Sequence, residues 1–158
     1  FMSHCQSTDI GSTQSLILQL PIVAKYVLLA SFLAAHNPPK SDAQMFSAEA
    51  GPRKKRRRTK KVSKEISTLL TGPKPFGLTR MLAIFDSIYH DMESCGQTVI
   101  HTLTSSLVRL KLLSQVQSTT RSDPFLRGLV LTCNVSLEDV RFLSDRMQLP
   151  LANYLYNP

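Results

Sequence analysis

The sequence contains no tryptophan, and only 7% of its 158 residues are aromatic. Its three cysteines, Cys5, Cys95 and Cys133, lie far apart and form no CxxC pair. An odd number of scattered cysteines argues against a disulfide scaffold, and no signal peptide is visible. We therefore expect an intracellular protein with reduced thiols. The four histidines show neither HxxxH nor HExxH spacing, so the common helical zinc motifs are excluded.

Motifs for nucleotide binding and catalysis are also lacking. No GxxxxGK[ST] phosphate-binding loop occurs in the chain. Ser136 and Asp139 stand at capping-box spacing before an apolar periodic segment, so a helix cap explains them better than catalysis does. Cys95 has no basic neighbour that is placed to activate its thiol. We expect neither enzymatic activity nor a bound cofactor or metal in these residues.

One long apolar run is present, LILQLPIVAKYVLLASFLAA, over residues 16–35. The run is long enough to span a bilayer, but Gln19, Pro21 and Lys25 interrupt it. We therefore predict a buried core helix from about residue 20 to residue 35, and no membrane partner. Residues 1–15 are rich in Ser, Thr and Gly without hydrophobic periodicity, which predicts a loose lead-in.

The net positive charge comes from one short segment, GPRKKRRRTKK, over residues 51–61. Eight of the 19 Lys and Arg residues lie there, and the other eleven balance the 11 acidic residues. Dense like charge opposes compaction, so residues 38–71 are predicted to be a disordered basic insertion. The run can contact duplex DNA non-specifically, be read by a nuclear import receptor, or be a solvated loop with neither role. Its basic residues are Arg53, Lys54, Lys55, Arg56, Arg57, Arg58, Lys60 and Lys61.

Hydrophobic periodicity predicts the remaining elements. They are helices over residues 77–92 and 98–113, strands over 114–118 and 129–133, a helix that begins after Ser136, and a short helix over 151–156. Together with the first helix, this order is typical of a winged-helix domain. The fold class is therefore mainly α, with a three-helix core, a β-hairpin wing and C-terminal helices over residues 20–157, and with a long basic insertion after the first helix.

In this fold the helix over residues 98–113 takes the recognition position, and residues 114–134 form the wing. A helix that reads bases in the major groove needs Arg, Lys, Asn or Gln side chains on its exposed face. The sequence offers few of them. The candidate contacts to the DNA backbone are Arg109, Lys111, Arg121 and Arg127. Base reading, phosphate contact and a surface that faces only protein all stay open.

Three stretches carry a resemblance to a known family. They are LPIVAKYVLLASFLAAHNPPKSDAQMF (20–46), GPKPFGLTRMLAIFDSIYH (72–90) and CNVSLEDVRFLSDRMQLPLANYLYN (133–157). In this order and spacing they resemble the C-terminal region of subunit 5 of the eukaryotic origin recognition complex. The sequence departs from the family at Ile22 and Val23, where the family usually has aromatic residues.

The resemblance implies that residues 1–19 are a lead-in from an AAA+ ATP-binding module, to which any bound ATP belongs. It also implies a nuclear subunit of a ring-like complex that encircles origin DNA and helps to load the replicative helicase at the start of DNA replication. The winged helix is expected to pack against other subunits, with the fourth and third as neighbours. Two alternatives remain: a sequence-specific winged-helix transcription factor whose helix over 98–113 reads bases, and a winged-helix scaffold in an unrelated nuclear complex.

Overall fold

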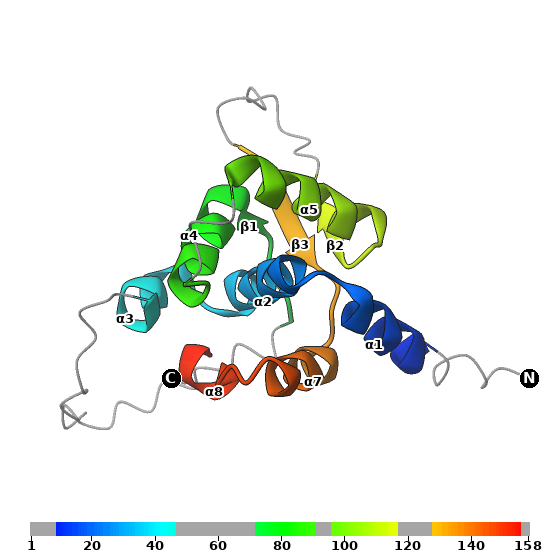
Figure 1. The fold of residues 1–158 in the computed structure, drawn as a ribbon. Helices are drawn as coiled ribbons and strands as arrows, with labels where there is room; N and C mark the ends of the chain where they lie inside the picture. The colour runs from blue at the N-terminus through cyan, green and yellow to red at the C-terminus, as the bar shows by residue number, and fades with distance from the viewer. Residues whose placement is uncertain (1–8, 47–71, 91–95, 117–127, 156–158) are drawn as a thin grey trace, which may run out of the picture.

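The computed structural model describes residues 9–46, 72–90, 96–116 and 128–155 (Figure 1). Within these ranges the fold is mainly helical, with one small antiparallel sheet of three strands. The elements, in chain order, are α1 (Asp9–Gln19), α2 (Ile22–His36), the 3-10 helix η1 (Pro39–Ser41), α3 (Asp42–Phe46), β1 (Phe76–Gly77), α4 (Leu78–Ile88), α5 (Gln97–Arg109), β2 (Leu113–Gln115), β3 (Val130–Cys133), α7 (Leu137–Arg146) and α8 (Leu151–Tyr154).

Helix α2 forms the centre of the molecule. It packs against α4, α5 and α7 and against strands β1 and β3. Figure 1 shows it between α4 and α5 on one side and α7 and α8 on the other. Every residue from 27 to 35 is buried, so this part of the helix has no solvated face. This confirms the prediction of a buried core helix. No helix in the described ranges combines the length and apolar character that a membrane span requires.

Helix α1 corrects one expectation, because residues 9–15 belong to a helix and not to a loose lead-in. Pro21 separates α1 from α2, since proline has no backbone N–H for a continuing helix. The side chain of Ile17 is fully buried, and α1 packs on α7. Tertiary packing therefore stabilises a polar segment with little helical periodicity of its own. The prediction that residues 1–19 lead in from an AAA+ module remains untested.

The sheet has the strand order β1-β3-β2, and both pairings are antiparallel. Leu113 pairs with Cys133 and Gln115 with Leu131, which confirms the predicted pairing of the two later strands. Strand β1 was missed, because it consists of only two residues after a proline-rich segment. Leu131 lies on the central strand and is fully buried, so the sheet forms one wall of the core.

The predicted cap by Ser136 at the start of α7 is confirmed. The hydroxyl of Ser136 accepts a hydrogen bond from the Asp139 backbone N–H at 3.2 Å and donates one to the Asp139 carboxylate at 2.8 Å. This exchange satisfies one of the N–H groups that a helix start leaves unpaired, and it places a carboxylate at the positive end of the helix dipole. The local sequence alone sets the start of α7.

The first residues of the predicted insertion are helical, which corrects the prediction of disorder for residues 39–46. Residues 39–46 form η1 and α3, and α3 packs against α4 and α8. The rest of the predicted insertion, residues 47–71 with the basic run, lies outside the described residues. Its predicted disorder stays a prediction.

Candidate functional site

Helix α5 carries the face that the sequence analysis put forward for DNA contact. Its exposed hydroxyl groups are engaged within the helix itself: Thr102 Oγ1 donates to the carbonyl of Thr98 at 2.9 Å, and Ser106 Oγ donates to that of Thr102 at 3.0 Å. Exposed cations in the described part of this region are Arg109 at the end of α5 and Lys111 two residues later. The face thus presents few side chains that could reach base edges.

The end of α5 corrects the predicted boundary, since the helix stops at Arg109 and not near residue 113. The backbone N–H of Lys111 donates to the Val108 carbonyl, and that of Leu112 to the Leu107 carbonyl. This pair of bonds is a Schellman motif, which turns the chain out of the helix and into β2. Leu110, which follows Ile100 and Leu107 at helical spacing, is 43% exposed because it stands at this turn.

Lys111 occupies the left-handed position of the motif, with φ of 61°. Glycine is usual there, because a Cβ atom in this region clashes with the neighbouring backbone. The side-chain amide of Asn134 donates to the Lys111 carbonyl at 3.0 Å and to the Ser114 hydroxyl at 2.7 Å, and these bonds hold the strained turn. Lys111 is therefore an exposed cation on a strained backbone.

Replacing Lys111 with glycine separates the strain from the charge. We expect Lys111→Gly to raise the free energy of unfolding by about 0.5–1 kcal/mol in urea titrations, because the strain disappears and the greater entropy of unfolded glycine offsets only part of the gain. Lys111→Ala removes the same charge and keeps the strained φ, so it should leave stability within about 0.5 kcal/mol. Equal stabilities of the two variants would show that the turn is not strained.

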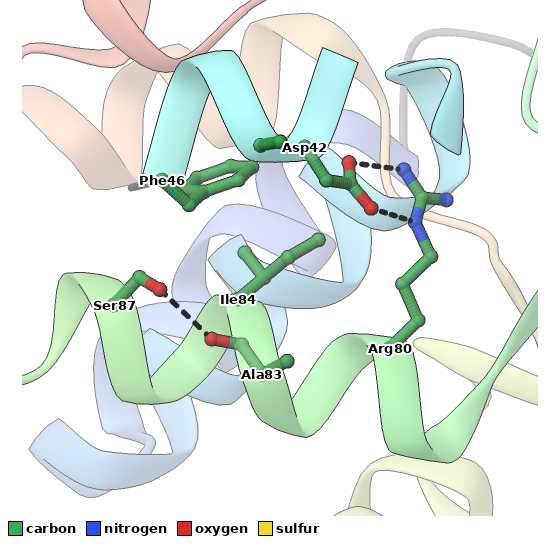
Figure 2. Close-up of a pocket in the computed structure, with 7 residues that line it drawn as sticks. Asp42, Phe46, Arg80, Ala83, Ile84 and Ser87 are labelled. Carbon is green, nitrogen blue, oxygen red and sulfur yellow. Dashed lines mark hydrogen bonds and ion pairs between the residues drawn. The ribbon is translucent and has the colours of Figure 1, made fainter. Parts of the chain in front are cut away.

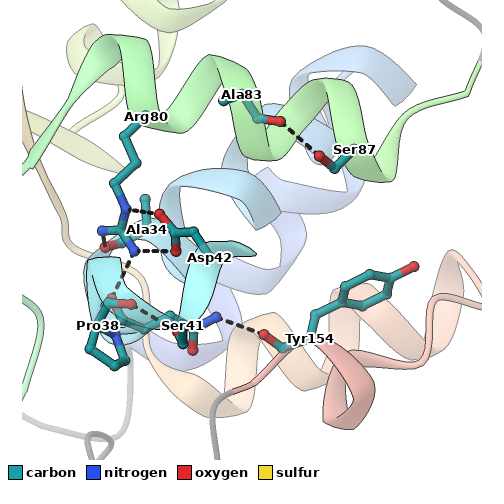
Figure 3. A network of polar contacts seen from close by, with 9 residues as sticks. Ala34, Pro38, Ser41, Asp42, Arg80, Ala83, Ser87 and Tyr154 are labelled. Atoms are coloured by element: carbon teal, nitrogen blue, oxygen red, sulfur yellow. Dashed lines mark hydrogen bonds and ion pairs between the residues drawn. The ribbon is translucent and has the colours of Figure 1, made fainter. Parts of the chain in front are cut away.

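A polar junction around Arg80 joins elements that are far apart in the sequence (Figure 3). Arg80, on α4, holds the Asp42 carboxylate through two bonds, Nε to Oδ2 at 2.6 Å and Nη2 to Oδ1 at 2.8 Å. It also donates to the carbonyls of Ala34 and Asn37 at 2.6 and 2.9 Å. These carbonyls lie at the C-terminal end of α2, where a helix leaves acceptors unpaired and a cation is favoured.

Asn37 extends the junction to the last helix. Its side-chain amide donates to the Tyr154 carbonyl on α8 at 2.7 Å, and the Tyr154 ring stacks on that of Phe46 with centroids 6.0 Å apart. The three stretches that carry the family resemblance therefore meet here: Asn37 and Asp42 come from the first, Arg80 from the second and Tyr154 from the third. The junction anchors α3 at the start of the segment that leads to the basic run.

Beside the junction lies a shallow hollow of about 240 Å³ between α3 and α4. Its lining is largely apolar, and Figure 2 shows the Arg80–Asp42 pair at one end and the Phe46 ring at the other. Both members of the ion pair are bonded to each other, so the hollow presents no unbalanced charge. Neither its shape nor its charge specifies a ligand.

Two titratable groups are shifted by burial. Burial lowers the pKa of His36 below its ordinary 6.5, and the contact between its ring Nδ1 and the Phe32 carbonyl at 3.0 Å opposes this shift only in part. The neutral ring is thus favoured in the folded state, so stability decreases as pH falls below about 6.5. Burial also raises the pKa of Cys133 to about 11, which keeps this thiol protonated and unreactive at neutral pH.

Of the candidate DNA contacts, the structure describes Arg109 and Lys111 and leaves the remaining ten outside its described residues. These ten are the eight of the basic run together with Arg121 and Arg127. Among the described residues no group of His, Cys, Asp or Glu could hold a metal ion. The Arg80–Asp42 pair was missed, because the two residues stand 38 positions apart and no local pattern joins them. Both residues lie in stretches that carry the family resemblance.

Comparison with known proteins decides the family. The family model described as the C-terminus of origin recognition complex subunit 5 matches residues 20–155. The chain belongs to this family. The match begins just after α1 and covers α2 through α8, including the Arg80 junction and the predicted insertion. The resemblance carried by the three quoted stretches is thereby confirmed.

Individual relatives in the family agree with this. The chain is 35% identical to origin recognition complex subunit 5 of Homo sapiens, over 95% of this chain and 34% of that protein. It is 31% identical to the Schizosaccharomyces pombe subunit 5, over 87% of this chain and 34% of that protein. The chain thus spans about a third of the length of these relatives.

The fold also resembles a solved structure, a chain in the structure of Drosophila ORC bound to DNA. The TM-score is 0.60 at 27% sequence identity, and the alignment covers 92% of this chain and 32% of that one. The helical architecture with its small sheet therefore recurs in an origin recognition complex chain. This supports the mainly helical fold class.

Proposed function

We propose that this domain is a winged helix that acts mainly in assembly, by presenting a surface to neighbouring subunits within an origin recognition complex. The expected neighbours are the fourth and third subunits. In this proposal the domain is not an enzyme, and ATP binding belongs to an AAA+ module that precedes it in the full-length protein. The domain contributes to origin DNA binding at replication initiation through charge and not through base recognition.

The order of the elements supports the winged-helix assignment. Apart from η1 and α3, which lie between α2 and β1, the described elements from α2 to β3 follow one another as helix, strand, helix, helix, strand, strand. Helix α5 then takes the recognition position, and the antiparallel strands β2 and β3 form the base of the wing. The tip of that wing lies in residues 117–127, outside the described residues.

The observation that carries the assembly role is the chemistry of the exposed face of α5. Sequence-specific readers contact bases through bidentate Arg, Asn or Gln side chains. Apart from Arg109 at its end, the exposed surface of α5 carries Thr102, Ser105 and Ser106, whose hydroxyls donate to carbonyls of the preceding turn. A face of this kind suits contact with protein or with phosphates more than contact with base edges.

The basic run adds a second part to the proposal. Eight cations in nine residues can release counterions from any duplex, and the same pattern is what a nuclear import receptor binds. The segment extends from an anchored point, because α3 is held to α4 by Arg80. We propose that the run addresses the protein to the nucleus and adds non-specific affinity for duplex DNA. The two roles are compatible.

Binding to a panel of unrelated duplexes tests the assembly role against base reading. With the full 158-residue chain, we expect dissociation constants that differ by less than about threefold between sequences and that rise steeply with salt. Fluorescence anisotropy at two salt concentrations measures both. A transcription factor would prefer one sequence by about 10³-fold or more, and such a preference would overturn the proposal.

A further inference from the structure

A groove lies between α5 and the sheet, separate from the Arg80 junction. One wall is a single face of α5, whose residues follow the helical spacing i, i+3, i+4, i+7 and i+8. The opposite wall comes from β2, from β3 and from the residue before β3. The lining residues are His101, Thr104, Ser105, Val108, Arg109, Gln115, Leu129 and Leu131, and they enclose about 290 Å³.

The groove has an apolar floor and a polar rim. Leu131 is fully buried at its base, and Val108 and Leu129 are half-buried beside it. His101, Arg109 and Gln115 are exposed at the rim. A floor of this kind accepts an aliphatic or aromatic side chain of a partner. The residues on either side of that side chain would then contact the polar rim, so they should be polar or charged.

Among the described residues of α5, β2, β3 and the turns beside them, the formal charges are positive. Residues 96–116 and 128–136 contain no Asp or Glu, whereas Arg109 and Lys111 are exposed within them. No carboxylate in these two ranges competes for the guanidinium of Arg109.

We propose that this groove binds a segment of another protein in which an apolar side chain is flanked by Asp or Glu residues. The apolar side chain would enter between Val108 and Leu129, and the flanking carboxylates would meet Arg109 and Lys111. This inference rests on the proposed assembly function and specifies its partner chemistry. A DNA backbone offers nothing to fill the apolar floor, so an acidic segment of a protein fits the groove better.

Two serines of α5 provide a matched pair for the test. Ser105 lines the groove and Ser106 does not, although both are exposed and both hydroxyls donate to the carbonyl four residues earlier, at 3.0 Å. Ser105→Tyr fills the groove with an aromatic ring without changing the charge. Ser106→Tyr adds the same ring to the neighbouring face. A third variant, Arg109→Glu, reverses the charge at the rim and leaves the floor intact.

The probes are fluorescein-labelled peptides that carry one Leu, Met, Phe or Tyr with two Asp residues on each side. In anisotropy titrations with the full chain, we expect at least one peptide to bind with a dissociation constant below about 1 mM. Ser105→Tyr and Arg109→Glu should each weaken that binding about tenfold or more, and Ser106→Tyr should leave it within about twofold. Circular dichroism melts of each variant establish that all three remain folded.

Other outcomes overturn the proposal. If no peptide binds, or if Ser105→Tyr and Ser106→Tyr have equal effects, the groove is not the docking site. If a duplex of about 30 base pairs displaces the bound peptide and its own affinity falls with Ser105→Tyr, the groove binds nucleic acid instead. Each of these results leaves the assembly function open, because co-purification of the chain with the other subunits of its complex tests that function by itself.

Discussion

Replacing Arg80 with alanine is expected to lower the free energy of unfolding by about 3 kcal/mol. The guanidinium serves the Asp42 carboxylate and the carbonyls of Ala34 and Asn37 through four hydrogen bonds (Figure 3). Its removal leaves the Asp42 carboxylate without this counter-charge and takes one donor from each of the two helix-end carbonyls. Hydrogen bonds that involve a charged group contribute about 1.5–3 kcal/mol each when they are buried.

Solvent makes the expected loss of stability smaller than the sum for four fully buried hydrogen bonds. The side chains of Arg80 and Asp42 are 20% and 28% exposed, so water replaces some of the lost partners. We expect a smaller loss of stability for Asp42→Asn, because the amide oxygen can still accept one bond from Arg80. Water reaches this partly exposed pair and reduces the loss further. We expect about 1–2 kcal/mol for that variant.

Urea denaturation of the full chain measures these losses, and Arg109→Ala is the matched control. Arg109 is exposed at the end of α5, so its removal should change the free energy of unfolding by less than about 0.5 kcal/mol. Arg80→Lys should recover only part of the stability, because a single ammonium group cannot reproduce the planar fork that meets both carboxylate oxygens. A loss below about 1 kcal/mol for Arg80→Ala would show that the junction does not stabilise the fold.

Replacing the cations from Arg53 to Lys61 with Gly and Ser is expected to weaken binding to a random duplex by about 30-fold or more at low salt. The replaced residues hold eight of the chain's 19 basic side chains, and the rest of the chain is electrically balanced. Binding that depends on released counterions falls with each cation removed, and its dependence on salt becomes shallower.

A permuted run supplies the control. A variant with the same eight cations in a different order keeps the charge, so its affinity for duplex DNA should stay within about twofold of the original. Nuclear accumulation of a fluorescent fusion, measured with the same variants, reports the targeting role separately. If replacing the run leaves DNA affinity unchanged, the run serves import alone, and the folded surface of the domain is the place to look for contacts.

Several features followed from the sequence because their causes are local. Gln19, Pro21 and Lys25 interrupt the long apolar run, and the residues from 27 to 35 are apolar enough to require burial on every side. Ser136 and Asp139 set the start of α7 through bonds between residues three positions apart. The β-branched and apolar run over residues 129–133 predicted β3.

Tertiary structure alone decided the rest. The polar residues 9–15 are helical because α1 packs on α7, and the two residues of β1 form a strand because Phe76 pairs with Leu131 on β3. The bond from Asn37 to Tyr154 joins residues 117 positions apart. The groove likewise combines α5 with Gln115 on β2 and with Leu129 and Leu131, which follow the end of α5 by about twenty positions. Helical and strand periods report only which face of an element is apolar. Which distant elements pack together depends on how the buried backbone and side-chain groups are paired by hydrogen bonds in the whole fold. Local sequence patterns carry no information on that pairing.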